Sequence, residues 1–148
     1  IVTRTFSKIY GMAGLRVGYA LTSPQVADWI NRIRQPFNVN TVALYCAQAA
    51  LSDEEFVIYS PQTNAVQRAS LGSELEARGL RCVPSQANFI TFDCGRPSTP
   101  VYQAMLHEGV IVRPLESYAM PEHLRVTVGS EKENQVFLAA LDSVLERA

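Results

Sequence analysis

The segment Thr5–Ala20 reads "TFSKIYGMAGLRVGYA" and carries the strongest chemical signal in the chain. It places Lys8 next to the hydroxyl side chains of Thr5 and Ser7, and Arg16 follows eight residues after the lysine. A partly desolvated lysine can attack a carbonyl group. Hydroxyls and an arginine suit an oxyanion such as phosphate. From spacing alone, the segment predicts either such a reactive lysine or an ordinary solvated lysine in a glycine-rich turn.

Short apolar segments flank this loop, and they are expected to form strands at Ile1–Arg4 and Val17–Leu21. Ser23 and Pro24 are residue types that are favoured at a helix N-cap and at the first helical position. Pro36 is expected to end the helix that they start. Two more helices are expected at Thr41–Leu51 and at Pro61–Arg78, the second stopped by Gly79.

After Gly79 the pattern becomes rich in β-type alternation. Strands are expected at Asn88–Asp93, Gly109–Arg113 and Leu124–Val128, with a helix over about residues 99–108 and a capping box before the closing helix. The fold class predicted is α/β. Residues 1–40 are interpreted as the remnant of one α/β domain. Residues 41–148 are interpreted as linking helices and a small α+β domain, in which helices pack on a small sheet.

Composition excludes several classes of function. The 148 residues are 47% apolar and 18% charged, and 13 basic against 14 acidic side chains give a net charge of −1. This balance gives no electrostatic reason to expect nucleic acid or an anionic membrane as a partner. Cys46, Cys82 and Cys94 lie far apart, so we expect no metal site and a reducing, cytoplasmic setting. No apolar run is long enough to suggest a membrane span.

The Thr5–Ala20 segment resembles the lysine signature of the class I/II aminotransferases of fold type I, which depend on pyridoxal 5′-phosphate (PLP). This resemblance implies PLP as the cofactor and Lys8 as the Schiff-base lysine that also carries the proton. It further implies that Thr5, Ser7 and Arg16 hold the cofactor phosphate.

Three further segments are similar to histidinol-phosphate aminotransferases within that superfamily. They are "RQPFNVNTVALYCAQAAL" (Arg34–Leu51), "PSQANFI" (Pro84–Ile90) and "GVIVRPLESYAMPEHLRVTVG" (Gly109–Gly129). The resemblance implies the C-terminal part of a fold-type I enzyme, in which residues 1–40 come from the large PLP-binding domain. It also implies a phosphorylated amine and 2-oxoglutarate or glutamate as substrates, and a homodimer in the cytoplasm.

Alternation in "LRVTV" places Arg125 on the face opposite to Leu124 and Val126. Burial of an arginine in the middle of a strand costs free energy unless an anion pairs with it. The resemblance assigns Arg125 to a substrate carboxylate and Arg113 to a substrate phosphate.

Structural alternatives remain for these residues. Arg113 and Arg125 could form salt bridges with Glu116 or Glu122, which are near in sequence. Asn88 could bind near the substrate carboxylate or could simply begin its strand. We therefore treat the substrate-binding roles of Arg125, Arg113 and Asn88 as hypotheses.

The chain begins at Ile1 without a methionine, and we expect it to be the C-terminal piece of a longer enzyme. The family's aspartate for the pyridinium nitrogen, its cofactor-binding asparagine and tyrosine, and its glycine-rich phosphate loop would lie upstream. Without that aspartate the cofactor loses its main support as an electron sink. We therefore expect that these 148 residues alone do not transaminate.

Two other functions fit the same sequence. A threonine-phosphate decarboxylase has a similar chain and would release CO₂, so product analysis would separate it from a transaminase. The aminotransferase-like sensing domain of helix-turn-helix transcription regulators is a non-catalytic alternative. That alternative requires a DNA-binding segment upstream.

Overall fold

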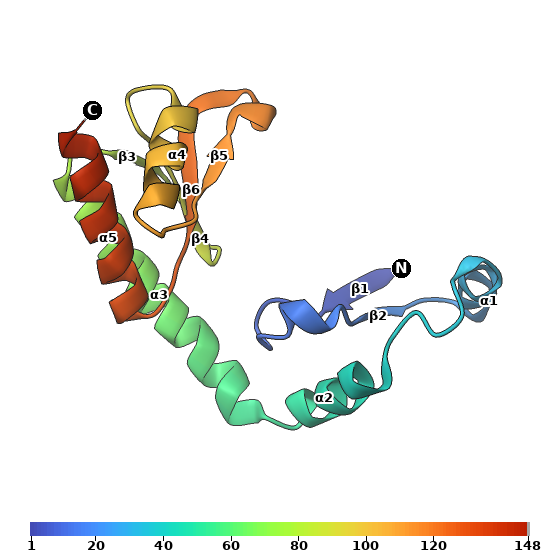
Figure 1. Cartoon of the computed structure of the whole chain (residues 1–148). Helices are drawn as coiled ribbons and strands as arrows, with labels where there is room; N and C mark the ends of the chain where they lie inside the picture. The colour runs from blue at the N-terminus through green and yellow to red at the C-terminus, as the bar shows by residue number, and fades with distance from the viewer. Residues whose placement is uncertain (148) are drawn as a thin grey trace. The chain divides into compact units, whose positions relative to one another are not determined.

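The computed structural model describes residues 1–147, and the chain has a mixed α/β fold, as the sequence predicts (Figure 1). It divides into two compact units, Ile1–Pro61 and Gln62–Ala148. The interpretation of residues 1–40 as the remnant of a larger domain is a separate question and stays a prediction.

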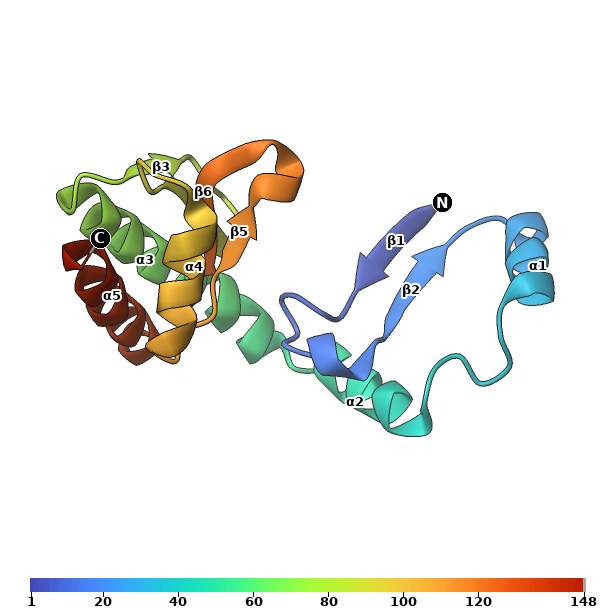
Figure 2. The ribbon, with the colours of Figure 1, turned by 45° about the horizontal axis from the view of Figure 1, so that its top comes forward.

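The first unit begins with a two-stranded antiparallel ribbon (Figure 2). Its strands are β1 (Val2–Thr5) and β2 (Gly18–Leu21), so both predicted strands are confirmed to within one residue at each end. Every residue of the two strands is exposed. Between them lies the Lys8 loop with one short 3₁₀ turn, η1 (Ala13–Leu15).

Two predicted helices of this unit are confirmed. In α1 (Pro24–Ile33), the N-cap Ser23 Oγ accepts a hydrogen bond from the Val26 N–H at 3.4 Å. In α2 (Thr41–Leu51), the Asn40 Oδ1 accepts one from the Ala43 N–H at 2.8 Å. Each cap satisfies an N–H group that has no partner inside the helix.

Replacing Asn40 by alanine is expected to destabilise the start of α2 by about 1 kcal/mol, because the Ala43 N–H loses its acceptor. Hydrogen exchange of the α2 amides measures this change locally. Gln48→Ala on the exposed side of the same helix is the control, and we expect it to change exchange by much less. Equal effects of the two substitutions would contradict the role of the cap.

The predicted start of the third helix is wrong. The helix α3 spans Glu54–Ala77, and Pro61 lies inside it rather than at its first turn. The missed start signal is Asp53, whose Oδ1 accepts the Phe56 N–H at 3.0 Å. Proline removes one hydrogen bond but does not end this helix. The predicted stop is right: Gly79 has φ +77° and donates its N–H to the Glu76 carbonyl at 2.9 Å.

The second unit contains a four-stranded antiparallel sheet in the order β3-β4-β6-β5. Its strands are β3 (Arg81–Val83), β4 (Phe89–Asp93), β5 (Arg113–Leu115) and β6 (Met120–Thr127). The sequence predicted β4 and the second half of β6, and it missed β3. A further 3₁₀ turn, η2 (Glu116–Tyr118), joins β5 to β6.

The predicted strand at Gly109–Arg113 is wrong except for its last residue. Gly109 has φ +78°, and the Val110 N–H bonds to the Met105 carbonyl at 2.9 Å. These apolar residues therefore form the exit from the preceding helix, and the strand begins only at Arg113.

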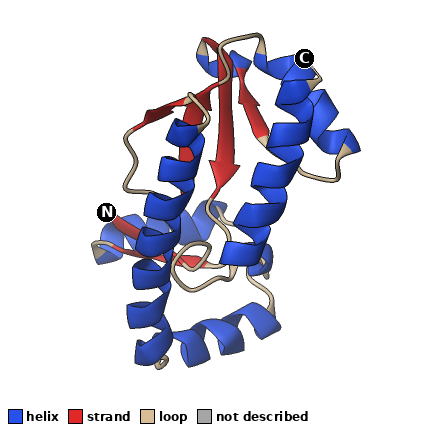
Figure 3. Cartoon of the chain, turned by 90° about the vertical axis from the view of Figure 1, so that its left-hand side faces the viewer, coloured by secondary structure: helices blue, strands red, loops and turns tan. Residues whose placement is uncertain are grey.

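Helices cover one face of this sheet (Figure 3). They are α4 (Ser98–His107), α5 (Glu131–Glu146) and the C-terminal half of α3. The predicted capping box of α5 is confirmed, with Ser130 and Glu133 bonded reciprocally. The core consists of apolar side chains from both layers, among them Leu71, Leu75, Ile90, Phe92, Met105, Leu124, Val126, Phe137 and Leu141. Strand alternation sends Arg125 and Asp93 to the opposite face.

Arg78, which directly follows α3, forms one ion pair with α5 and one with α3 on the surface of the second unit. Arg78 donates through Nε to Asp142 Oδ1 at 2.6 Å and through Nη1 to Glu74 Oε2 at 2.7 Å. The guanidinium holds the pKa of the Asp142 carboxyl below its ordinary value. The two helices lie alongside each other in the ribbon as well (Figure 1).

Candidate functional site

The four residues of the predicted lysine site lie at the end of β1 (Thr5) and on the loop that follows it in the first unit. The ribbon register pairs Thr5 with Gly18, and the Phe6 N–H then donates to the Val17 carbonyl at 3.2 Å. Ser7 and Arg16 come next on the two arms, at the same end of the ribbon. The antiparallel ribbon therefore brings the backbone of the predicted phosphate-binding residues together from both sides of the loop.

Backbone hydrogen bonds close the turn that carries the lysine. The Lys8 carbonyl accepts the Gly11 N–H at 2.9 Å, and Gly11 has φ +67°, a conformation that favours glycine. The Phe6 carbonyl accepts the Met12 N–H at 3.0 Å. Lys8 itself is exposed. The turn is thus fixed by its own backbone and leaves the lysine side chain open to a ligand.

The hydroxyl and guanidinium groups have local partners. Thr5 Oγ1 accepts the Ser7 N–H at 3.0 Å, and Arg16 donates through Nη1 to the Ala13 carbonyl at 2.7 Å. Arg16 has φ +55° and ends the η1 turn. Arg16 forms no ion pair with any of residues 1–147. Its positive charge is therefore available to an external anion.

A small apolar cluster anchors this loop. Phe6 and Val17 pack with Ala43 and Ala47 of α2, and all four are buried. At Gly18 an added Cβ would lie 2.7 Å from the Arg4 carbonyl oxygen, which explains the glycine. The loop thus holds a primary amine, two hydroxyls and a guanidinium on a supported turn, a set that fits a ligand with a carbonyl and a phosphate group.

In the second unit, the sheet places the two predicted arginines side by side. Arg113 of β5 and Arg125 of β6 are directly opposite each other in the antiparallel register. Opposite residues of an antiparallel pair point to the same face, so two like charges share it, which is unfavourable without an anion. The sequence alone could place each arginine on a strand but could not pair them.

The structural alternative of salt bridges to nearby glutamates is not realised. Within residues 1–147, neither Arg113 nor Arg125 forms an ion pair. The Glu116 carboxylate instead accepts the Thr99 hydroxyl at 3.1 Å. The arginines lie over aromatic rings: Arg125 is 4.8 Å from the Phe89 ring centroid, and Arg113 is 5.9 Å from that of Tyr118.

Asn88 directly precedes β4 and is exposed. Its carbonyl accepts the Val128 N–H at 2.9 Å and so ties the start of β4 to the end of β6. This bond gives Asn88 the strand-starting role that the sequence left open. Its side chain has no hydrogen-bond partner among residues 1–147, so a ligand-binding role stays a prediction.

Other reactive groups do not form a rival site in the described chain. Burial raises the pKa of the Cys94 thiol to about 11, and it also raises that of Cys82, so neither thiol is an activated nucleophile. Residues 1–147 contain no cluster of metal-binding side chains. No helix within residues 1–147 is long and apolar enough to span a membrane.

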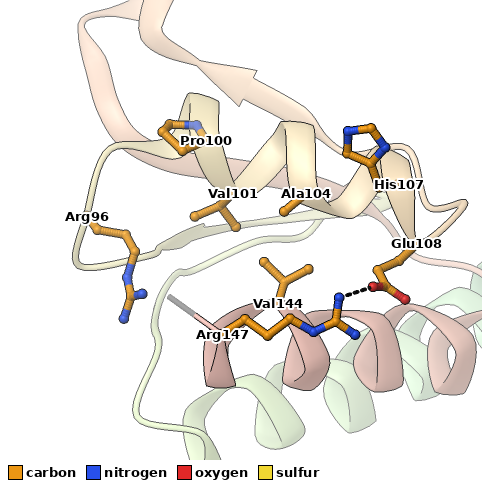
Figure 4. Close-up of a pocket in the computed structure, with 8 residues that line it drawn as sticks. All are labelled: Arg96, Pro100, Val101, Ala104, His107, Glu108, Val144 and Arg147. Atoms are coloured by element: carbon orange, nitrogen blue, oxygen red, sulfur yellow. Dashed lines mark hydrogen bonds and ion pairs between the residues drawn. The ribbon is translucent and has the colours of Figure 1, made fainter.

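A pocket of about 280 Å³ lies between α4 and α5 (Figure 4). Its apolar walls include Val101, Ala104 and Val144, and the Arg147–Glu108 ion pair, at 2.9 Å, crosses it. It lies on the helix-covered side of the sheet and contains none of the predicted site residues.

Sequence reasoning missed the side chains that support the arginine pair. The register pairs Thr91 of β4 with Arg125 of β6. Phe89 and Asp93 lie two residues before and after Thr91, so their side chains are on the same face of the sheet as that of Arg125. The alternation in "NFITFD" carries this signal, but only the strand order shows which arginine these residues meet.

Comparison with curated proteins supports a family assignment. The family model for class I and II aminotransferases matches residues 1–141. Histidinol-phosphate aminotransferase 2 of Methylococcus capsulatus is 57% identical over 145 residues, which are 98% of this chain and 39% of that protein. Histidinol-phosphate aminotransferase 2 of Pseudomonas fluorescens is 54% identical over 147 residues, 99% of this chain and 40% of that protein. The chain therefore spans about 40% of the length of these relatives.

Solved structures give the same result at lower identity. Histidinol-phosphate aminotransferase from Clostridium acetobutylicum matches with a TM-score of 0.88 and 26% identity, over 99% of this chain and 46% of that one. The enzyme from Sinorhizobium meliloti, solved in complex with pyridoxal-5′-phosphate, matches with a TM-score of 0.86 and 29% identity, over 98% of this chain and 41% of that one. By sequence and by fold, this chain belongs to the class I and II aminotransferases.

Proposed function

We propose that the full-length gene product is a PLP-dependent aminotransferase that exchanges an amino group between histidinol phosphate and 2-oxoglutarate. The observation that carries the proposal is the ribbon end in the first unit, where Ser7 and Arg16 flank a supported turn bearing Lys8. The names of the relatives support the choice of substrate. The 148 residues alone are proposed to be inactive.

The residues of the loop fit PLP. Arg16 and the hydroxyls of Thr5 and Ser7 would hold its phosphate through charge-assisted hydrogen bonds. The Lys8 amine would bond to its aldehyde carbon with loss of water, until the substrate amine displaces it and leaves the lysine amine free. Bound PLP supplies an electron sink for the charge that remains when a proton leaves the substrate Cα. Lys8 would take that proton as a general base and return it as a general acid.

The arginine pair suits two substrates with different anionic groups. Glutamate has carboxylates and no phosphate, whereas histidinol phosphate has a phosphate and no carboxylate. Arg125 would bind the α-carboxylate of glutamate, and Arg113 would bind the phosphate of histidinol phosphate. Asn88, one residue before the Phe89 ring that supports Arg125, would add a hydrogen bond to the carboxylate. Two arginines on one face thus give one enzyme two ways to orient a substrate.

We also propose that the full-length protein is a cytoplasmic homodimer, with residues 1–40 belonging to its large PLP-binding domain and residues 41–148 to linking helices and a small domain. Several large apolar side chains of the first unit support an interface, since Leu21, Trp29, Ile33 and Phe37 are all more than half exposed. Apolar surface of this kind marks contact regions. The three cysteines are free thiols, which is consistent with a reducing compartment.

The test is product analysis with the full-length gene product, PLP, histidinol phosphate and 2-oxoglutarate. Formation of glutamate in step with loss of the phosphorylated amine is the expected result. A parallel reaction contains threonine phosphate in place of histidinol phosphate. Release of CO₂ in that reaction, with no glutamate formed in either, would contradict the proposal and favour the decarboxylase. The 148-residue chain under the same conditions is expected to form no glutamate.

A further inference from the structure

The outer face of the sheet in the second unit sets a carboxylate beside the proposed carboxylate-binding arginine. The register pairs Thr91 with Arg125 and Asp93 with His123. Phe89 and Asp93 are therefore the two diagonal neighbours of Arg125 on β4. Diagonal neighbours in an antiparallel pair are about 7–8 Å apart, which is within reach of a long side chain. Arg125 can therefore turn toward an aromatic ring or toward an acid.

Arg125 lies over the ring and not on the acid. Its guanidinium carbon is 4.8 Å from the Phe89 centroid, and it forms no ion pair with any of residues 1–147. An arginine within reach of a carboxylate would ordinarily bind it, because charge-assisted bonds are stronger than a contact with a ring at a partly exposed site. The absence of that bond needs a cause.

The cause lies on the neighbouring strand. Arg81 of β3 is directly opposite Asp93 and donates through Nη2 to Asp93 Oδ2 at 2.5 Å. The Gly95 N–H donates to Asp93 Oδ1 at 2.8 Å. These bonds occupy both carboxylate oxygens, and the Asp93 side chain is only 8% exposed. Two contacts hold the pKa of the Asp93 carboxyl below its ordinary value. The hydrogen bond from the Gly95 N–H has the larger effect, and the hydrogen bond from Arg81 adds to it.

We propose that Arg81 is a positioning residue that engages the Asp93 carboxylate and so leaves Arg125 free for the carboxylate of a substrate. The proposal rests on the proposed function of Arg125. It adds that Arg81 helps to set the affinity of Arg125 for the substrate carboxylate. Arg81 need not touch the substrate, since its effect passes through Asp93.

Without Arg81, the Asp93 carboxylate would compete with the substrate as an internal anion. We expect Arg81→Gln to raise the dissociation constant for a dicarboxylate by about two- to fivefold, the size of one partly exposed charge pair. Asp93→Asn in the Arg81→Gln background is expected to restore binding, because the competitor is then neutral. Arg81→Lys retains a cation opposite Asp93 and is expected to preserve most of the affinity.

Nitrogen-15 NMR of the 148-residue chain gives a readout that does not depend on catalysis. The Arg125 Nε–Hε signal is followed while the sample is acidified until the Asp93 carboxylate becomes protonated. His123 also faces Asp93, so the double variant, which retains His123 but lacks the Asp93 carboxylate, separates the contributions of the two groups. In the wild type the Arg125 signal should be independent of Asp93 protonation. In Arg81→Gln it should follow the Asp93 titration, and in the double variant it should not.

The full-length protein and the same variants of it are then titrated with glutarate as the probe. Arg147→Gln is the matched control, because Arg147 is also an exposed arginine that pairs with a carboxylate, Glu108, but on the far side of the sheet. The proposal is overturned if Arg81→Gln weakens glutarate binding while the Arg125 signal does not respond to protonation of Asp93. That result would mean that the affinity falls only because a positive charge has been removed. If the full-length wild type binds no glutarate, the proposed carboxylate site fails, and the pH titration still decides the role of Arg81.

Discussion

Replacing Lys8 by alanine is expected to abolish borohydride trapping of PLP and to lower turnover of the full-length protein by about 10²–10⁴-fold, the contribution of a positioned acid–base group. Both effects have one cause, because the same amine is proposed to bond to the cofactor and to move the substrate proton. The turn around Lys8 is fixed by backbone bonds from Gly11 and Met12, so removal of the exposed side chain leaves the loop intact.

The chain offers a sharp control for this experiment, because its only other lysine is Lys132. Lys132 is exposed near the start of α5. Mass spectrometry of the reduced protein should find the PLP adduct on the Lys8 peptide in the wild type and in Lys132→Ala, and not in Lys8→Ala. Lys8→Arg retains the positive charge and should also lose the adduct. An adduct that persists without Lys8, or that never forms there in the full-length protein, would contradict the cofactor role.

Local sequence signals were sufficient for much of the fold. Ser23, Gly79 and the Ser130–Glu133 capping box act within one helical turn, and the structure confirms each of them. The wrong start of α3 has a local cause as well. Proline at a first turn is a common signal, but Asp53 caps the helix, which therefore begins at Glu54, seven residues earlier than predicted. In the structure the cap at Asp53, and not Pro61, sets the start of the helix.

Other features of the fold depend on which strands pair with each other, and no local sequence pattern indicates this pairing. β3 has only three residues and is defined by its pairing with β4, so no periodicity was long enough to indicate it. The apolar run after Gly109 has a strand-like composition but forms the exit from α4. Tertiary packing overrides propensity in such short segments.

The candidate site also has one part that local sequence signals predict and one part that depends on strand pairing. The motif around Lys8 is enough to identify the candidate cofactor-binding residues, because they lie close together in the sequence on a single ribbon. The pairing of Arg113 with Arg125, and the engagement of Asp93 by Arg81, are properties of sheet order and register. A sequence can nominate the arginines, but only the register shows that they share a face without a carboxylate partner within residues 1–147.

Separate substitutions of the two arginines are expected to affect different substrates. Arg125→Gln should raise the KM for glutamate by about 10- to 100-fold, since charged hydrogen bonds contribute about 1.5–3 kcal/mol. It should change the KM for histidinol phosphate much less. Arg113→Gln should do the reverse. The physical reason is that each substrate brings only one of the two anionic groups. Steady-state kinetics of both half-reactions in the full-length protein gives the four values.

Loss of folding cannot imitate this result. Arg113 and Arg125 are like charges directly opposite each other, so neutralising either one relieves repulsion in the sheet. Arg96→Gln, at the pocket on the helix-covered side, removes the same charge away from the pair and should leave both KM values unchanged. Arg125→Lys tests geometry, because lysine retains the charge but lacks the planar fork that binds a carboxylate through two bonds. If each glutamine variant raises both KM values equally, the two arginines form one shared anion site, and the division between carboxylate and phosphate is wrong.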